Sequence, residues 1–298
     1  MNITALFNAL PGACAQGLIW GIMAIGVFIT YKILDIADLT VDGTMCTGGA
    51  VCVVMMINGV NVWVALLCAF IAGMLAGLLT GVLHTVMGIP AILAGILTQL
   101  ALYSINLRII GSSNQAISSR KYSLLVSLMH IPQAALVSAL FIVALIAVLY
   151  WFFGTELGCS LRATGCNMAM ARAQGINTSF TRVLGLMLSN GIVALSSALF
   201  SQYSGFADIN MGRGAIVIGL AAVIIGEVLF GKRFKNFALK LLAVVLGAVL
   251  YYLVIQLVLW LGLNTDDLKL LTALVVAVFL SIPHLKNRYF AKGARGHA

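Results

Sequence analysis

The sequence has 298 residues, of which 62% are hydrophobic and only 8% are charged. Soluble domains carry about 25% charged residues, so this composition excludes a soluble protein and predicts an all-α, polytopic membrane protein. The formal net charge of +9 comes from Lys and Arg residues at the ends of apolar runs. That placement sets membrane topology and favours contact with membrane lipid, and it does not indicate binding to nucleic acid.

About nine membrane segments follow one another along the chain. A spanning helix needs about 20 apolar residues. Two segments, 36–58 and 206–230, open with a polar stretch before the apolar run, which predicts two broken helices. We expect one transmembrane domain over residues 1–298, with a cytoplasmic tail at 286–298. The plainly apolar spans are 13–31, 62–83, 89–110, 134–153, 183–203, 238–263 and 268–285.

A short internal similarity links the two broken segments. Residues 37–41, ADLTV, align with residues 207–211, ADINM, at an offset of 170 positions (208 minus 38). Counting the spans between them places the two copies in opposite directions across the membrane, which is typical of transporters. The prediction is an inverted repeat with a first copy, a central span and a second copy, and a chance match is the alternative. The three parts are 13–110, 134–153 and 183–285.

Residues 154–182 form the one long polar interruption of the apolar sequence. Three arginines lie in this stretch, and each costs roughly 2.5 to 3.5 kcal/mol at the centre of a membrane helix, so we expect it outside the bilayer. Placing it in the cytoplasm puts most Lys and Arg residues on the inside. The positive-inside rule therefore predicts an outside N-terminus and an inside C-terminus.

The same loop predicts a small docking helix. Asn167 can cap its start, and Gly175 can end it in a left-handed conformation. Between these two residues, the small side chains at 169, 171 and 173, all alanines, give the helix a small cross-section. An ordinary interhelical loop is the alternative.

Polar side chains gather where the two broken segments begin. Ionisable groups at membrane depth are costly to bury and are therefore functional candidates. Capping of helix N-termini by Asp38 and Asp208 is an alternative role, and the two roles are compatible. We expect a substrate path lined by Asp38, Thr40, Asp42, Thr44, Gln99, Asp208 and Asn210.

Catalytic and nucleotide-binding patterns are not recognisable in the sequence. Residues 226–233, GEVLFGKR, resemble a phosphate-binding loop but end in Arg where Ser or Thr must hold magnesium. The cysteines and histidines lack the spacing of metal ligands. We expect this chain to carry no metal and no cofactor, and to catalyse no covalent chemistry.

Several stretches together resemble a known family. Residues 157–177, with LG at 157, RATGCN at 162 and AMARAQGIN at 169, are similar to the cytoplasmic coupling loop of ABC importer permeases of the branched-chain amino acid and ribose type. The resemblance extends to DLTV at 38–41 and GLAAVIIG at 219–226. It implies a homodimer of permeases, an ATP-binding cassette subunit that binds ATP and magnesium, and an extracytoplasmic binding protein or lipoprotein. It assigns ATPase coupling to Gly165, Asn167, Ala169, Ala171, Arg172, Ala173 and Gly175.

Two departures from the ribose-type pattern bear on the substrate. Asp42 stands near the position of a glycine in that branch, and Glu227 stands where a second glycine follows Gly226. Both resemble a smaller branch linked to tryptophan and tyrosine. We expect import of a small polar metabolite across the cell membrane, with an amino acid, aromatic or branched-chain, as the first choice. The alternatives are a sugar or nucleoside permease, an ion-coupled secondary transporter that uses the aspartates, and an assembly partner without transport.

Overall fold

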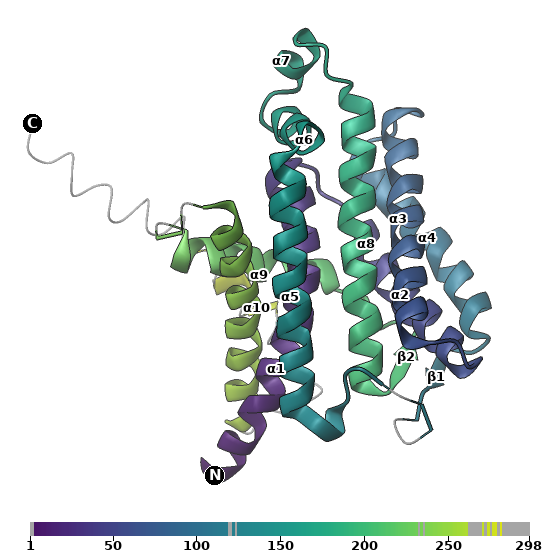
Figure 1. Cartoon of the computed structure of the whole chain (residues 1–298), viewed down its shortest axis with the longest axis vertical. Helices are drawn as coiled ribbons and strands as arrows, with labels where there is room; N and C mark the ends of the chain where they lie inside the picture. The colour runs from purple at the N-terminus through teal and green to yellow at the C-terminus, as the bar shows by residue number, and fades with distance from the viewer. Residues whose placement is uncertain are drawn as a thin grey trace, which may run out of the picture.

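The computed structural model describes residues 3–261, apart from 119, 120, 123, 232 and 235, and a few positions between 270 and 281. These residues are mostly helical (Figure 1). The first half contains α1 (Ile3–Phe28), the π-helical turn η1 (Ile29–Ile33), α2 (Thr40–Ile57), α3 (Val62–Thr85), α4 (Ala91–Ile110) and strand β1 (Asn114–Ala116). The second contains η2 (Leu128–His130), α5 (Ile131–Gly154), α6 (Glu156–Cys166), α7 (Met168–Ala173), α8 (Thr178–Ser204), β2 (Phe206–Asp208), α9 (Ala215–Phe230) and α10 (Phe237–Trp260).

Within the described residues, seven helical stretches are long and apolar enough to cross a membrane. They confirm seven of the nine predicted segments. They also confirm that the protein is helical and polytopic. The predicted segment 206–230 contains only a 16-residue helix, α9, which is short for a span. The predicted segment 268–285 lies largely outside the described residues.

Both broken segments open as predicted, with a non-helical polar stretch before the helix. The first follows η1 and runs from residue 34 to residue 39, where Asp35 has a positive φ of 54°. The second contains β2, which pairs antiparallel with β1, and ends at Gly214 with φ 84°. Glycine adopts this left-handed conformation without steric cost, which lets the chain reverse into α9.

Helix α1 lies at the centre of the bundle and contacts α5, α8, α9 and α10 (Figure 1). Helix α8 also packs closely against α3. A Cβ atom at Gly73 or Gly77 of α3 would overlap backbone atoms of Asn190 or Leu186 on α8. Such backbone contact is how membrane helices associate, since lipid supplies no hydrophobic force between them.

Replacing Gly77 with Leu is therefore expected to prevent normal folding. The new side chain would collide with the backbone of Leu186 and Met187, which cannot move aside as a flexible side chain could. We expect a strongly reduced yield of folded protein and a lower Tm in detergent. Gly12→Ala in α1 is the control, because its Cβ would meet only ordinary van der Waals contacts, the nearest at 3.8 Å. Equal yields and Tm values for the two variants would contradict this account of the packing.

Helices α4 and α5 turn many large apolar side chains away from the bundle. Leu100 on α4, and Val143 and Trp151 on α5, are well exposed, Trp151 to 72%. In a membrane these faces contact lipid or another subunit.

Candidate functional site

Asp38 anchors the first broken segment to α8. The side chain is 2% exposed, and its Oδ1 accepts a hydrogen bond from the Thr40 N–H at 2.9 Å. Its Oδ2 accepts from the side-chain amide of Asn190 at 2.7 Å. The Thr44 hydroxyl in turn donates to the Asn190 amide oxygen at 2.7 Å. A buried carboxylate needs such partners, because leaving it unpaired costs several kcal/mol.

The same polar network crosses from α2 to α3 and α4. The hydroxyl oxygens of Thr40 and Thr80 lie 2.7 Å apart, and Thr80 lies 2.9 Å from Thr98. All three threonines are buried. Asp38, Thr40 and Thr44 thus lie inside the packing of four helices in this structure, and their place in a substrate path stays a prediction. Sequence reasoning missed Asn190, Thr80 and Thr98, since single polar residues in apolar helices gave no distinguishing pattern.

Asp42 joins the two broken segments directly. Its carboxylate accepts hydrogen bonds from the backbone N–H groups of Gly214, at 3.0 Å, and Ile216, at 2.9 Å. These groups lie at the N-terminus of α9, where N–H groups lack partners within the helix and the dipole favours an anion. The sequence suggested capping for Asp38 and Asp208. In the structure, Asp42 caps α9 from a different helix, while Asp208 accepts from the N–H of Asn210, at 2.6 Å, in its own loop.

Replacing Asp42 with Ala is expected to destabilise the protein by about 1.5 to 3 kcal/mol, the usual contribution of hydrogen bonds to a charged group. Thermal unfolding in detergent measures the effect. Asp42→Asn keeps one oxygen acceptor and should fall between the unchanged protein and Asp42→Ala. An alanine variant as stable as the unchanged protein would show that this contact does not hold the two segments together.

A cavity of about 280 Å³ lies between α2, α4 and the loop before α9. Gln99, a predicted path residue, lines it together with Asn106 and Arg213. Asn106 is 1% exposed, and its amide oxygen accepts no hydrogen bond from any described residue. The predicted residues Asp208 and Asn210 lie in the adjacent loop, half-buried and exposed respectively.

Arg213 also lines a second cavity of about 620 Å³, together with Tyr251, Tyr252 and Gln256 of α10 and Gln16 of α1. A guanidinium is a strong partner for a carboxylate, and aromatic walls suit an apolar side chain. The two cavities therefore offer polar and aromatic groups beside the point where the broken segments meet. Sequence reasoning missed Arg213, because nothing local distinguished it from the other basic residues.

The predicted short helix is present as α7, which follows α6 at the end of the bundle (Figure 1). Its role in docking stays a prediction. The Asn167 side chain accepts from the Met170 N–H at 3.1 Å and caps it, as predicted. Gly175 follows with φ 81°, which confirms the predicted left-handed end. Arg172 is tied back by a bond from its Nε to the Thr178 hydroxyl at 2.8 Å.

The predicted coupling residues face in different directions. Five are exposed and available for a partner, namely Asn167, Ala169, Arg172, Ala173 and Gly175. Ala171 is only 3% exposed and packs inward. Gly165 on α6 is seated against η1, where an added Cβ would overlap the carbonyl oxygen of Ile33. The outer face of α7 is thus open, Gly165 packs α6 against η1, and the coupling role of these residues stays a prediction.

Residues 11–282 match the family described as the permease component of branched-chain amino acid transport systems. The chain belongs to this family. It is a multi-pass permease subunit of an ABC importer, which confirms the resemblance found in the sequence.

Among similar proteins, the tyrosine transport system permease protein of Clostridioides difficile is 42% identical, covering 93% of this chain and 92% of that protein. The fructose import permease FruF of Bifidobacterium longum is 26% identical over 84% of this chain and 71% of that protein. A solved structure of PsaBC from Streptococcus pneumoniae in complex with Fab covers 94% of this permease and 95% of that chain, with a TM-score of 0.55. At 16% identity, that likeness concerns the fold alone.

Proposed function

We propose that this permease imports an amino acid with an aromatic side chain, driven by ATP hydrolysis in a partner subunit. The observation that carries the proposal is the 42% identity, over nearly the whole chain, to a permease named for tyrosine transport. The named sugar permease is more distant, at 26%. The cavities beside Arg213 supply a cation for a carboxylate and tyrosine rings for an aromatic group.

Two features support an inverted repeat in the proposed architecture. At Asp38 and at Asp208, one repeat offset apart, the carboxylate accepts the N–H two residues later. The same offset relates α1 to α8 and α3 to α10. In the one pair, α1 packs on α10 at the α1 glycines Gly17 and Gly21. In the corresponding pair, α8 packs on α3 at the α3 glycines Gly73 and Gly77. An inverted repeat places the substrate path where its two copies meet.

The proposed complex contains two copies of this permease, two ATPase subunits and an extracytoplasmic binding protein or lipoprotein. The N-terminus lies outside and the C-terminus inside, so that α6 and α7 face the cytoplasm. An ATPase that closes on ATP would move α7 and α6. Because Gly165 rests on Ile33, that movement would reach η1 and the polar turn before α2. This turn contains Asp38, which is hydrogen-bonded to Asn190 of α8. Helix α2 in turn binds the N-terminus of α9 through the Asp42 carboxylate.

The proposal is tested by purifying the tagged permease with its genomic neighbours expressed, and then measuring uptake in proteoliposomes. We expect an ATPase to co-purify, and uptake of labelled tyrosine or tryptophan to require ATP on the ATPase side. Ribose serves as the substrate control. Uptake driven by an ion gradient, without a co-purified ATPase, would overturn the mechanism. ATP-driven uptake of ribose without uptake of amino acids would overturn the substrate only.

A further inference from the structure

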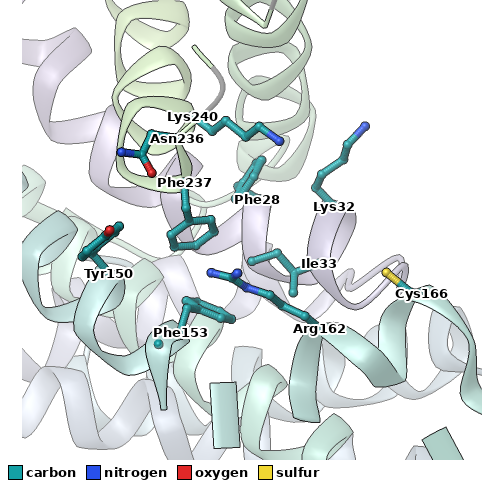
Figure 2. Close-up of a pocket in the computed structure, with 11 residues that line it drawn as sticks. Phe28, Lys32, Ile33, Tyr150, Phe153, Arg162, Cys166, Asn236, Phe237 and Lys240 are labelled. Carbon is teal, nitrogen blue, oxygen red and sulfur yellow. The ribbon is translucent and has the colours of Figure 1, made fainter. Parts of the chain in front are cut away.

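A third cavity, of about 630 Å³, lies at the end of the bundle that carries α6 and α7. Its walls come from the end of α1, the end of α5, helix α6 and the start of α10 (Figure 2). Three cationic side chains surround this hollow: Lys32 from η1, Arg162 from α6 and Lys240 from α10. The mechanism proposed above passes beside this cavity, through Gly165 and Ile33, and assigns the cavity no occupant.

Aromatic rings hold the Arg162 guanidinium inside the cavity. Its central carbon lies 4.4 Å from the ring centroid of Phe237 and 5.2 Å from that of Phe153. Figure 2 shows the guanidinium directed at these two rings. A cation over an aromatic face is stabilised by the ring quadrupole and keeps its N–H groups free to donate at the guanidinium edge. Arg162 is thus positioned and still able to bind an anion.

The cavity carries an excess of positive charge. Its described lining contains no Asp or Glu. Lys32 forms an ion pair with Glu227 at 2.8 Å. Glu227 belongs to the lining of an adjoining cavity, which Lys32 and Lys240 also line. With Lys32 paired in this way, the described lining of the cavity itself holds no carboxylate to balance the charges of Arg162 and Lys240. Two cationic side chains in the lining of one cavity favour an anionic occupant.

Aromatic residues typical of a membrane surface lie at the mouth of the cavity. Tyr150 lines it, and Tyr150 and the neighbouring Trp151 are both exposed near the end of the apolar helix α5. Tyr and Trp collect at the level of lipid headgroups. Closer to the N-terminus of α5, Val148, Val143 and Leu140 form an exposed apolar face that hydrocarbon chains can cover.

We propose that this cavity binds one anionic phospholipid, with its headgroup phosphate held by Arg162 and Lys240 and its acyl chains lying along α5. Basic pockets between membrane helices are suited to such headgroups. The occupant would bridge α6, in the proposed coupling region, to α10. The inference rests on the proposed orientation, which makes this the cytoplasmic leaflet, and it does not depend on the substrate.

The test measures phosphatidylglycerol binding to the detergent-purified permease complex, by the rise in Tm on titration and by the lipid retained in native mass spectrometry. Each Lys or Arg near an anionic lipid contributes about 1 kcal/mol. The double variant Arg162→Gln/Lys240→Gln should therefore bind about 30-fold more weakly than the unchanged complex. The double variant Arg108→Gln/Lys121→Gln removes the same charge from exposed positions that do not line this cavity, and should bind nearly as the unchanged complex does.

Three results would overturn the proposal. Phosphatidylcholine could stabilise the complex as well as phosphatidylglycerol, or both double variants could bind equally. Inorganic phosphate could produce the same rise in Tm, which would assign the cavity to a soluble anion. Lys240→Gln alone is the second variant if the double variant folds poorly, because Lys240 is exposed. None of these readouts involves transport, so failure here is distinct from failure of the proposed function.

Discussion

Replacing Asn190 with Leu is expected to lower the free energy of unfolding by roughly 3 to 5 kcal/mol, the usual effect of removing one partner of a buried charge. Asn190 donates to the Asp38 carboxylate and accepts from the Thr44 hydroxyl. Leu fills a similar volume but makes neither bond, and it leaves one carboxylate oxygen buried without its donor. For a chain of this size, the loss corresponds to a Tm about 10 °C lower.

Thermal unfolding of the purified permease in detergent measures this effect. Ser138→Ala on α5 is the matched control, since the Ser138 hydroxyl is buried and has no hydrogen-bond partner among the described residues. Removing that hydroxyl should change the Tm little. If Asn190→Leu and Ser138→Ala gave similar Tm values, the Asp38 network would not be a stabilising element.

Replacing Ala173 with Trp is expected to reduce ATP-driven uptake at least about tenfold, the effect of losing 1.4 kcal/mol of binding free energy. Ala169, Met170 and Ala173 form the exposed face of α7, and a bulky side chain there would hold an ATPase subunit away. Because Ala173 is exposed, the permease itself should keep its Tm. Ala171 is unsuitable for this experiment, since it is buried and Trp would disturb α7 itself.

Uptake in proteoliposomes and the amount of co-purified ATPase measure the result. Leu67→Trp on α3, at an exposed position with no role proposed above, adds a bulky side chain away from α7 and should retain both ATPase and uptake. A fully active Ala173→Trp complex would show that α7 does not dock the ATPase. Loss of uptake with normal ATPase retention would place the defect after docking, in transmission from α7 to the bundle.

Local features of this permease could be predicted from the sequence, because each depends on neighbouring residues. The apolar spans follow from their length, and the start and end of α7 follow from Asn167 as an acceptor and Gly175 as a left-handed residue. The polar openings of the two broken segments were visible for the same reason. So was family membership, since the loop at 157–177 is one continuous stretch.

The partners of the polar side chains were decided only by the tertiary structure. Asp38 meets Asn190, and Asp42 meets the start of α9, across separations that no local pattern encodes. These pairings depend on how far each helix slides and rotates against its neighbour, which is set where Gly73 and Gly77 allow backbones to touch. The same packing turns Ala171 inward. It also gathers three cations, scattered from residue 32 to residue 240, around one cavity, because helix packing, rather than sequence distance, determines which side chains meet.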